Sequence, residues 1–196
     1  MKKIAFKVSK FLALISLMSF TAEAQVNRKG LWVYFDLGDT VVLSKDMKKI
    51  KYFPGSKAYL SKLHQVGYKV GLISNIPESW GLDYNEKLLS LKKVISDGWI
   101  DAEKFDWDIF DEILLPLKNN EMKPAPFLFL RAIEKAGGCP SLYIGESPNE
   151  IQAAESHGMA GKLFAPNQPD LYIPMNDLRN YIIQNYKISY DEECLQ

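Results

Sequence analysis

Acidic, hydroxyl and basic side chains lie near the ends of several apolar segments of this chain. Two carboxylates, Asp36 and Asp39, are three positions apart in "YFDLGDTVV", while Ser74 and Glu146 follow later apolar runs and Lys123 precedes a proline. Carboxylates, a hydroxyl and an ammonium group are the groups that phosphoryl transfer uses. Taken singly, each residue has an ordinary explanation as a turn or helix-capping residue. Their chemistry therefore depends on whether the fold brings them together.

Short apolar runs alternate along the chain with segments of helical periodicity. The runs that predict buried strands cover residues 31–35, 68–73, 112–117 and 141–145, and the helical segments cover 54–67, 84–95, 124–137 and the part of the tail that follows residue 177. This alternation predicts an α/β fold with a Rossmann-like parallel sheet and helices on both faces. Because such sheets bind ligands beyond the carboxyl ends of their strands, we expect the polar residues in one site.

Together, and in this order, these segments resemble the four sequence motifs of the haloacid dehalogenase-like (HAD) hydrolase superfamily. The resemblance runs from "WVYFDLGDTVV" through "VGLISN" and "MKPAPFLFLRAIEKAG" to "YIGESPNEIQAAESHGM". The connecting segment "FPGSKAYLSKLHQVGYKVGLISN" is typical of phosphatase branches of the superfamily. The resemblance therefore implies a HAD-like hydrolase that acts on a phosphorylated substrate.

The resemblance assigns roles to three of the residues. Asp36 would attack phosphorus and form an aspartyl-phosphate, since a carboxylate needs no activating base at neutral pH. Ser74 would donate a hydrogen bond to a phosphoryl oxygen, and Lys123 would neutralise negative charge on the phosphoryl group and on Asp36. Preorganised electrostatics of this kind is the main resource for phosphoryl transfer.

The resemblance also implies Mg²⁺ as the cofactor. In the family, the nucleophilic carboxylate, the backbone carbonyl two residues later and an acidic residue of the last motif bind the ion, which here gives Asp36, Gly38 and Glu146. Glu150 would support the site or serve as an alternative ligand. Both glutamates stand where the family often has aspartate, and their oxygens are the hard donors that Mg²⁺ prefers.

Gly38 departs from the family pattern. Family phosphatases usually carry a second Asp at this position, which protonates the leaving oxygen and then activates water. Asp39 lies one position later, and a one-residue displacement at a strand end redirects a side chain, so Asp39 replaces the missing group only if the loop is remodelled. The loss of a general acid-base group typically costs about 10²- to 10⁴-fold in rate. We expect this loss to fall hardest on alkyl phosphates and least on aryl phosphates, acyl phosphates and anhydrides.

Three functions are compatible with this motif set. The first is an active Mg²⁺-dependent phosphatase that acts on a phosphomonoester or another phosphorylated substrate. The second is a catalytically weak or inactive protein that binds a phosphorylated ligand or a protein partner. The third is dehalogenase chemistry, which also proceeds without the second Asp. Dehalogenases fit poorly, because they carry a helical cap and do not need the acidic metal site that Glu146 suggests.

The spacing of the motifs leaves little room for a cap domain. Asp36 and Ser74 are 38 residues apart, and Ser74 and Lys123 are 49 residues apart, which is barely more than one helix and one strand require. We therefore expect a capless protein with an open site, which a macromolecular substrate or a partner subunit of a homo-oligomer would close. Trp80, Trp99 and Trp107 would either form a substrate rim or pack over the sheet edge.

The first 24 residues resemble a secretory leader. A lysine-rich start is followed by the apolar stretch "FLALISLMSF" and an Ala-Glu-Ala exit before residue 25. We interpret residues 1–24 as a signal peptide and 25–196 as one HAD-like hydrolase domain, exported to the periplasm or the medium with no stable membrane anchor after processing. The alternative is an uncleaved amino-terminal anchor.

The charge balance bears on which partners the protein binds, and the cysteine content bears on whether it contains a disulfide. The full sequence has 24 basic and 24 acidic residues, and removal of the leader leaves a slightly acidic chain. This balance gives no electrostatic reason to expect nucleic acid or an anionic membrane as a partner. Cys139 and Cys194 match no metal-binding pattern, and in an oxidising compartment they either pair or remain free thiols.

Overall fold

The predicted apolar runs form the central sheet of the protein. The computed structural model describes residues 29–165 and 171–195. Within them, five parallel strands pair in the order β5-β4-β1-β6-β7. The strand bounds are Trp32–Phe35 for β1, Lys69–Ile73 for β4, Glu112–Leu114 for β5, Ser141–Gly145 for β6 and Ala160–Leu163 for β7. The predicted α/β fold with a parallel sheet is confirmed, although β7 was not predicted.

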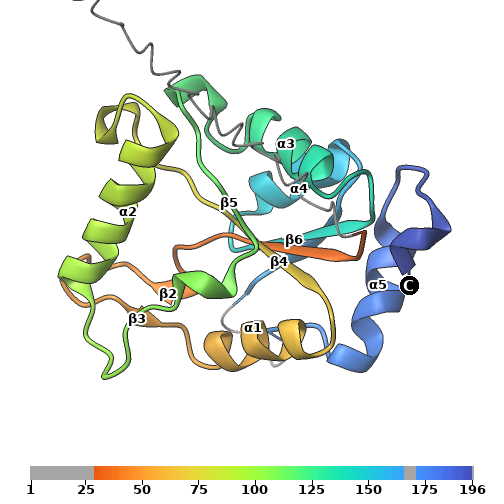
Figure 1. Ribbon diagram of the computed structural model, residues 1–196, viewed down its shortest axis with the longest axis horizontal. Helices are drawn as coiled ribbons and strands as arrows, with labels where there is room; N and C mark the ends of the chain where they lie inside the picture. Colours follow the sequence, from red (N-terminus) through yellow and green to blue (C-terminus); the bar gives the residue numbers. More distant parts are fainter. Residues whose placement is uncertain (1–28, 166–170, 196) are drawn as a thin grey trace, which may run out of the picture.

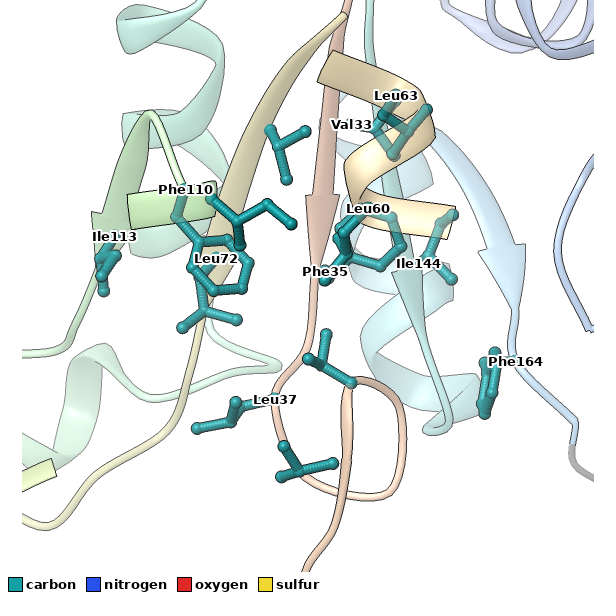
Figure 2. Close-up of a cluster of buried hydrophobic side chains, with 14 of the residues drawn as sticks. Val33, Phe35, Leu37, Leu60, Leu63, Leu72, Phe110, Ile113, Ile144 and Phe164 are labelled. Carbon is teal, nitrogen blue, oxygen red and sulfur yellow. The ribbon is translucent and has the colours of Figure 1, made fainter. Parts of the chain in front are cut away.

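Alternate residues of β1 face opposite sides of the sheet, as the pleat of a strand requires. Val33 and Phe35 pack in one buried cluster with Leu60 and Leu63 of the helix that covers this face (Figure 2). That helix is α1, and α5 covers the same face beside it (Figure 1). Their bounds are Ser56–Gln65 for α1 and Met175–Asn185 for α5.

The other face of the sheet is covered by α3 and α4 (Figure 1), with bounds Phe127–Lys135 and Pro148–Ser156. Tyr34 is fully buried on this face, and its hydroxyl donates a hydrogen bond to the Ala132 carbonyl at 3.0 Å. Its ring lies against Gly71 of β4, where a Cβ would come within 2.1 Å of a ring carbon. The absence of a side chain at Gly71 therefore allows the ring to lie across the neighbouring strand.

The strand predicted over residues 112–117 is shorter than expected. β5 pairs with β4 only up to Leu114, which is aligned with the last residue of β4. β5 is an edge strand, and Pro116 has no backbone amide that could extend its pairing. The predicted carboxyl end at residue 117 was therefore wrong, and the chain leaves the sheet three residues earlier.

Two helix boundaries also differ from the predictions. The helix expected over residues 124–137 begins at Phe127, because the preceding residues form a turn that the Ala125 amide closes with a 2.9 Å hydrogen bond. The helix expected over residues 84–95 is longer, since α2 covers Tyr84–Gly98. Its amino terminus is capped by the Asp83 side chain, which accepts a hydrogen bond from a first-turn amide at 2.9 Å.

A short antiparallel pair, β2 (Val42–Leu43) and β3 (Lys51–Tyr52), lies between β1 and α1 in the chain. Figure 1 shows α2 beside this pair. The two are joined where the Ile50 amide donates to the Gly98 carbonyl at 2.7 Å. A Cβ at Gly98 would lie 2.1 Å from the Met47 carbonyl oxygen, so the glycine allows close contact. The loop after β1 is thereby held against α2.

A disulfide joins Cys139 to Cys194, with 5.4 Å between their Cα atoms, and both residues are buried. Of the two alternatives that the sequence left open, the cysteines therefore pair. The bond fixes the carboxyl-terminal turn to the loop that precedes β6. Lys29 forms surface ion pairs with Asp191 and Glu193 of the same terminal segment.

The predicted signal peptide, residues 1–24, lies outside the described residues. Among residues 29–165 and 171–195, no helix combines the length and the apolar character needed to cross a bilayer.

Candidate active site

The carboxyl ends of β1, β4 and β6 meet at one cleft. Asp36, Ser74 and Glu146 each directly follow one of these strands and border a cleft of about 270 Å³. Gly38 and Asp39 border the same cleft from the loop after β1. The parallel sheet therefore brings five of the seven predicted site residues together, because equivalent ends of parallel strands lie side by side.

Lys123 contacts the predicted nucleophile directly, and its side chain is fully buried. Its Nζ lies 2.6 Å from Oδ1 of Asp36 and 2.8 Å from Oε2 of Glu150. A buried ammonium group without such partners would be strongly destabilising, so the two carboxylates and Lys123 depend on one another. Lys123 comes from the loop between β5 and α3 and contacts Asp36 at the edge of the cleft from beneath its surface.

Asn75 fixes the backbone of Lys123. Its side-chain amide donates to the Lys123 carbonyl at 2.9 Å, and its side-chain oxygen accepts a hydrogen bond from the Lys123 amide at 2.7 Å. This pair of bonds ties the loop that carries Lys123 to the end of β4. The sequence places Asn75 directly after Ser74 at the end of an apolar run, but only an ordinary turn role was expected for it, and its bonds to Lys123 were not predicted.

Tyr143 is a second residue that the sequence analysis missed. It lies on β6, where its hydroxyl accepts a hydrogen bond from Lys123 Nζ at 2.7 Å and donates one to Glu150 Oε2 at 2.6 Å. Burial and the nearby carboxylates, Asp36 first among them, raise the pKa of Tyr143 well above its usual value, so the hydroxyl keeps its proton. Tyr143 thus connects Lys123 to Glu150 and restricts the position of the ammonium group.

Glu150 lies on α4 and contacts Lys123 and Tyr143. It does not border the cleft formed by Asp36 and Glu146. Of the two roles predicted for it, support of the site and direct binding of a metal, these contacts favour support.

Asp36 and Glu146 place two carboxyl groups within hydrogen-bonding reach of each other. Partial burial and the Asp36 carboxylate raise the pKa of Glu146 to about 7. Two acidic oxygens that face each other form a site that a hard divalent cation would neutralise. Gly38 borders the same cleft and its backbone carbonyl is a further oxygen donor, so the donor types fit Mg²⁺. Within the described ranges, no group of three or more His, Cys, Asp or Glu side chains could hold a metal ion by themselves.

Asp39 is held in the turn after β1. It has a φ of 52°, an uncommon conformation for a residue with a side chain. Its Oδ1 accepts a hydrogen bond from the Ser44 amide at 3.1 Å, and its own amide donates to the Val42 carbonyl at 2.6 Å. These bonds give Asp39 a structural role, as expected for a short acidic side chain in a turn.

The position of Gly38 is crowded by a serine side chain. A Cβ at Gly38 would lie 2.9 Å from Ser44 Oγ. The backbone of Gly38 itself has no left-handed conformation, so the constraint on this position is the lack of space. The loop is therefore arranged around a glycine here, and Asp39 is directed to Ser44 instead.

Apolar side chains from α2, from the loop after β1 and from the turn after β4 border the cleft, and we call them its apolar wall. Trp80 lies on this wall, whereas Trp99 and Trp107 pack against Phe105 in an aromatic cluster away from the cleft. Of the three tryptophans, Trp80 has the rim position and the other two have the packing role. The other apolar side chains that border the cleft are Leu37, Val42, Met47, Ile76, Leu91, Val94 and Ile95.

Solved structures share this fold. One is a HAD family enzyme from Bacteroides thetaiotaomicron in complex with magnesium and inorganic phosphate, which is 14% identical over 72% of this chain and 97% of its own, with a TM-score of 0.50. Another is a hydrolase from Streptococcus pneumoniae TIGR4, which is 15% identical over 78% of this chain and 97% of its own, also with a TM-score of 0.50. No family model and no curated protein matches the chain. The similarity to solved structures shows that the protein has a HAD-like α/β fold.

Proposed function

We propose that the protein is an exported, Mg²⁺-dependent phosphatase that works through an aspartyl-phosphate on Asp36. The observation that carries the proposal is the contact of the buried Lys123 ammonium with the Asp36 carboxylate, at 2.6 Å, beside a cleft that Ser74 also borders. A carboxylate, a hydroxyl and a fixed cation around one small cleft suit the binding and transfer of a phosphoryl group. The complex of a similarly folded HAD enzyme with magnesium and phosphate supports the same reaction class.

In the proposed reaction, an oxygen of Asp36 attacks phosphorus while the bond between phosphorus and the leaving oxygen breaks. Lys123 stabilises the negative charge on the phosphoryl oxygens, and Ser74 donates a hydrogen bond to one of those oxygens. Water then attacks the phosphorus of the aspartyl-phosphate, which releases inorganic phosphate and restores the carboxylate. The residues are fixed before substrate arrives, which lowers the cost of organising them during the reaction.

Asp36, Glu146 and the Gly38 carbonyl are the groups that would hold Mg²⁺. The ion would neutralise the charge of the phosphoryl group and of the two carboxylates. Glu150 would act on the site through Lys123, because its carboxylate already contacts that ammonium group at 2.8 Å.

The cleft is proposed to work without a cap domain. In the described residues, the chain between β1 and β4 forms the β2–β3 pair and α1, and the chain between β4 and Lys123 forms α2, β5 and three short 3₁₀ turns. These segments belong to the sheet, its covering helices and one wall of the cleft. A large substrate or a partner subunit would then exclude water from the site.

Export is supported by two independent features. Residues 1–24 have the pattern of a cleavable leader. The disulfide between Cys139 and Cys194 belongs to the type of bond that persists in oxidising compartments and is rare in the cytosol.

One observation favours a second candidate function, a weak or inactive protein that binds a phosphorylated ligand. Asp39 is tied to the Ser44 amide, and Gly38 offers no acid, so the site lacks the group that normally assists the leaving oxygen and the attacking water. Without it, phosphate can be bound and yet released slowly.

Steady-state hydrolysis of an aryl phosphate by the mature protein separates the two candidates. We expect hydrolysis that requires Mg²⁺ and disappears in Asp36→Asn, with Asp97→Asn as a control on the exposed face of α2. Binding of inorganic phosphate without any Asp36-dependent hydrolysis would favour the second candidate. Full activity in Asp36→Asn would overturn the proposed mechanism.

A further inference from the structure

The candidate phosphoryl-binding residues and the apolar wall border the same cleft. Asp36, Ser74 and Glu146 give the cleft polar groups, while Trp80, Leu91 and Ile95 line the same cleft with apolar side chains. Leu91 and Ile95 belong to α2 and are almost fully buried, so the wall continues the hydrophobic core to the edge of the site. A group attached to a bound phosphate would therefore contact apolar side chains.

The wall is fixed before a ligand binds. Trp80 ends the 3₁₀ turn Glu78–Trp80, and its carbonyl accepts a hydrogen bond from the Ser90 hydroxyl of α2 at 2.6 Å. The fully buried side chain of Lys87 donates to the Pro77 carbonyl at the start of the same turn, at 2.9 Å. Two bonds from one helix thus hold the turn that carries the indole, and a preformed wall loses little conformational entropy on binding.

The loop after β1 limits the leaving group in a different way. Gly38 has no side chain that could donate a proton. The Asp39 carboxylate accepts a hydrogen bond from the Ser44 amide within its own turn. A leaving oxygen therefore receives no proton from either of these two positions. The pKa of a phenol is about 10, which is far below the pKa of an aliphatic alcohol. A phenolate therefore leaves without protonation much more easily than an alkoxide.

We propose that the substrate is an aryl phosphate monoester, with its aromatic ring against Trp80, Leu91 and Ile95. This inference rests on the proposed phosphatase function and specifies its substrate class. A bond forms between an Asp36 oxygen and phosphorus, the bond between phosphorus and the aryl oxygen breaks, and the electron pair leaves on the phenolate, which takes a proton from water. The second half of the reaction consumes one water and releases inorganic phosphate.

The size of the cleft agrees with one ring. Its volume of about 270 Å³ lies below the roughly 300–1,000 Å³ of pockets that enclose drug-sized ligands. A phosphoryl group and a single ring suit such a space, whereas a nucleotide would extend out of it. A free phenyl phosphate and a phosphotyrosyl side chain present the same chemistry to the cleft.

A set of four substrates separates the effect of the ring from the effect of the leaving group. Phenyl phosphate has both features, benzyl phosphate has the ring with a poor leaving group, acetyl phosphate has a good leaving group without the ring, and ethyl phosphate has neither. We expect kcat/KM to be highest for phenyl phosphate and lowest for ethyl phosphate, by at least about 100-fold, because the missing acid alone accounts for that much. Equal values for phenyl and ethyl phosphate would overturn the inference, while Asp36-dependent hydrolysis of both would leave the proposed function intact.

Binding of non-hydrolysable probes tests the wall without catalysis. In the presence of Mg²⁺, we expect phenylphosphonate to bind the mature protein about tenfold more tightly than methylphosphonate, as burial of part of a ring predicts. Trp80→Ala should remove most of this preference. Trp107→Ala is the matched control, since Trp107 is also partly buried but packs away from the cleft. Equal affinities for the two phosphonates, or equal effects of the two variants, would contradict the proposed wall.

Two further outcomes distinguish the failures. If phenylphosphonate binds selectively but no phosphate ester is hydrolysed through Asp36, both the aryl-substrate inference and the proposed function are wrong, and the cleft is a binding site. If a phosphotyrosyl peptide is hydrolysed faster than phenyl phosphate, the ring comes from a protein side chain, and if slower, from a free phenol. Either result keeps the aryl class.

Discussion

The Nζ atom of Lys123 lies 2.6 Å from Oδ1 of Asp36, and the Tyr143 hydroxyl lies 2.7 Å from the same Nζ. One buried cation is thus shared by the candidate nucleophile and by a tyrosine that also donates to Glu150. The position of the positive charge beside Asp36 depends on this group of residues, which come from four separate segments of the chain.

Removal of the Tyr143 hydroxyl should impair the site more than the fold. In Tyr143→Phe, Lys123 and Glu150 each lose one hydrogen bond, so we expect kcat/KM for phenyl phosphate to fall about tenfold and the free energy of unfolding to fall by about 1–3 kcal/mol. Tyr34→Phe is the matched control, because Tyr34 is equally buried and bonds only to the Ala132 carbonyl. A similar loss of activity in both variants, measured beside urea unfolding, would mean that Tyr143 has no specific role at the site.

A carboxylate introduced at Gly38 should extend the activity to alkyl phosphates. Since a Cβ there would lie 2.9 Å from Ser44 Oγ, we expect the double variant Gly38→Asp with Ser44→Ala to accept the side chain better than Gly38→Asp alone. Hydrolysis of ethyl phosphate should rise by at least about tenfold, a part of what general acid catalysis supplies. Gly38→Asn with Ser44→Ala has nearly the same shape and no acid, so an equal rise in that variant would argue against proton transfer.

The raised pKa of Glu146 makes the stability of the metal-free protein depend on pH. The pKa of Glu146 is about 7 in the folded protein, whereas an ordinary glutamate, as in the unfolded chain, has a pKa of 4.5. Folding therefore favours the protonated form of this side chain. This contribution to stability is fully present below about pH 4.5 and is lost as the pH rises through about 7. Urea unfolding in EDTA should show the decrease in the wild type and a smaller one in Glu146→Gln. Stabilisation by added Mg²⁺ should be greater at pH 8 than at pH 5, and equal effects at both would speak against Glu146 as a ligand.

The disulfide should stabilise the protein without contributing to catalysis. It joins residues 55 positions apart and borders no part of the Asp36 cleft. We expect Cys139→Ser with Cys194→Ser to lower the free energy of unfolding by about 2–4 kcal/mol, as the loss of a long closed loop predicts. The kcat/KM for phenyl phosphate should stay within about twofold of wild type below the melting temperature. A large loss of activity in the folded variant would show that the carboxyl-terminal segment influences the cleft.

The sequence predicts the residues at strand ends well, because their positions follow from the fold alone. Asp36, Ser74 and Glu146 each come directly after an apolar run, and a parallel sheet places such residues side by side. The resemblance to HAD motifs gave a role to Lys123, which lies between β5 and α3 rather than directly after a strand.

Residues that act through long-range contacts were not predictable in the same way. In the sequence, Tyr143 is indistinguishable from the apolar residues of the same predicted strand. Its contact with Lys123 depends on where a distant loop lies relative to β6. The role of Asp39 was left open because the direction of its side chain depends on a φ of 52° and on the Ser44 amide, five residues later. The end of β5 was misjudged because an apolar run continues beyond the point where its partner strand stops.

The phosphorylation state of Asp36 during turnover tests the central claim most directly. The group missing at Gly38 would also activate water, so the second step should be slow and the aspartyl-phosphate should accumulate with a phenyl phosphate substrate. Rapid mixing with Mg²⁺ should give a burst of phenol close to one per protein molecule, and acid quenching followed by peptide mass spectrometry should find the phosphoryl group on Asp36. The adduct should persist in Asp39→Asn and be absent in Asp36→Asn. Steady turnover with neither a burst nor an adduct on Asp36 would contradict covalent catalysis by this residue.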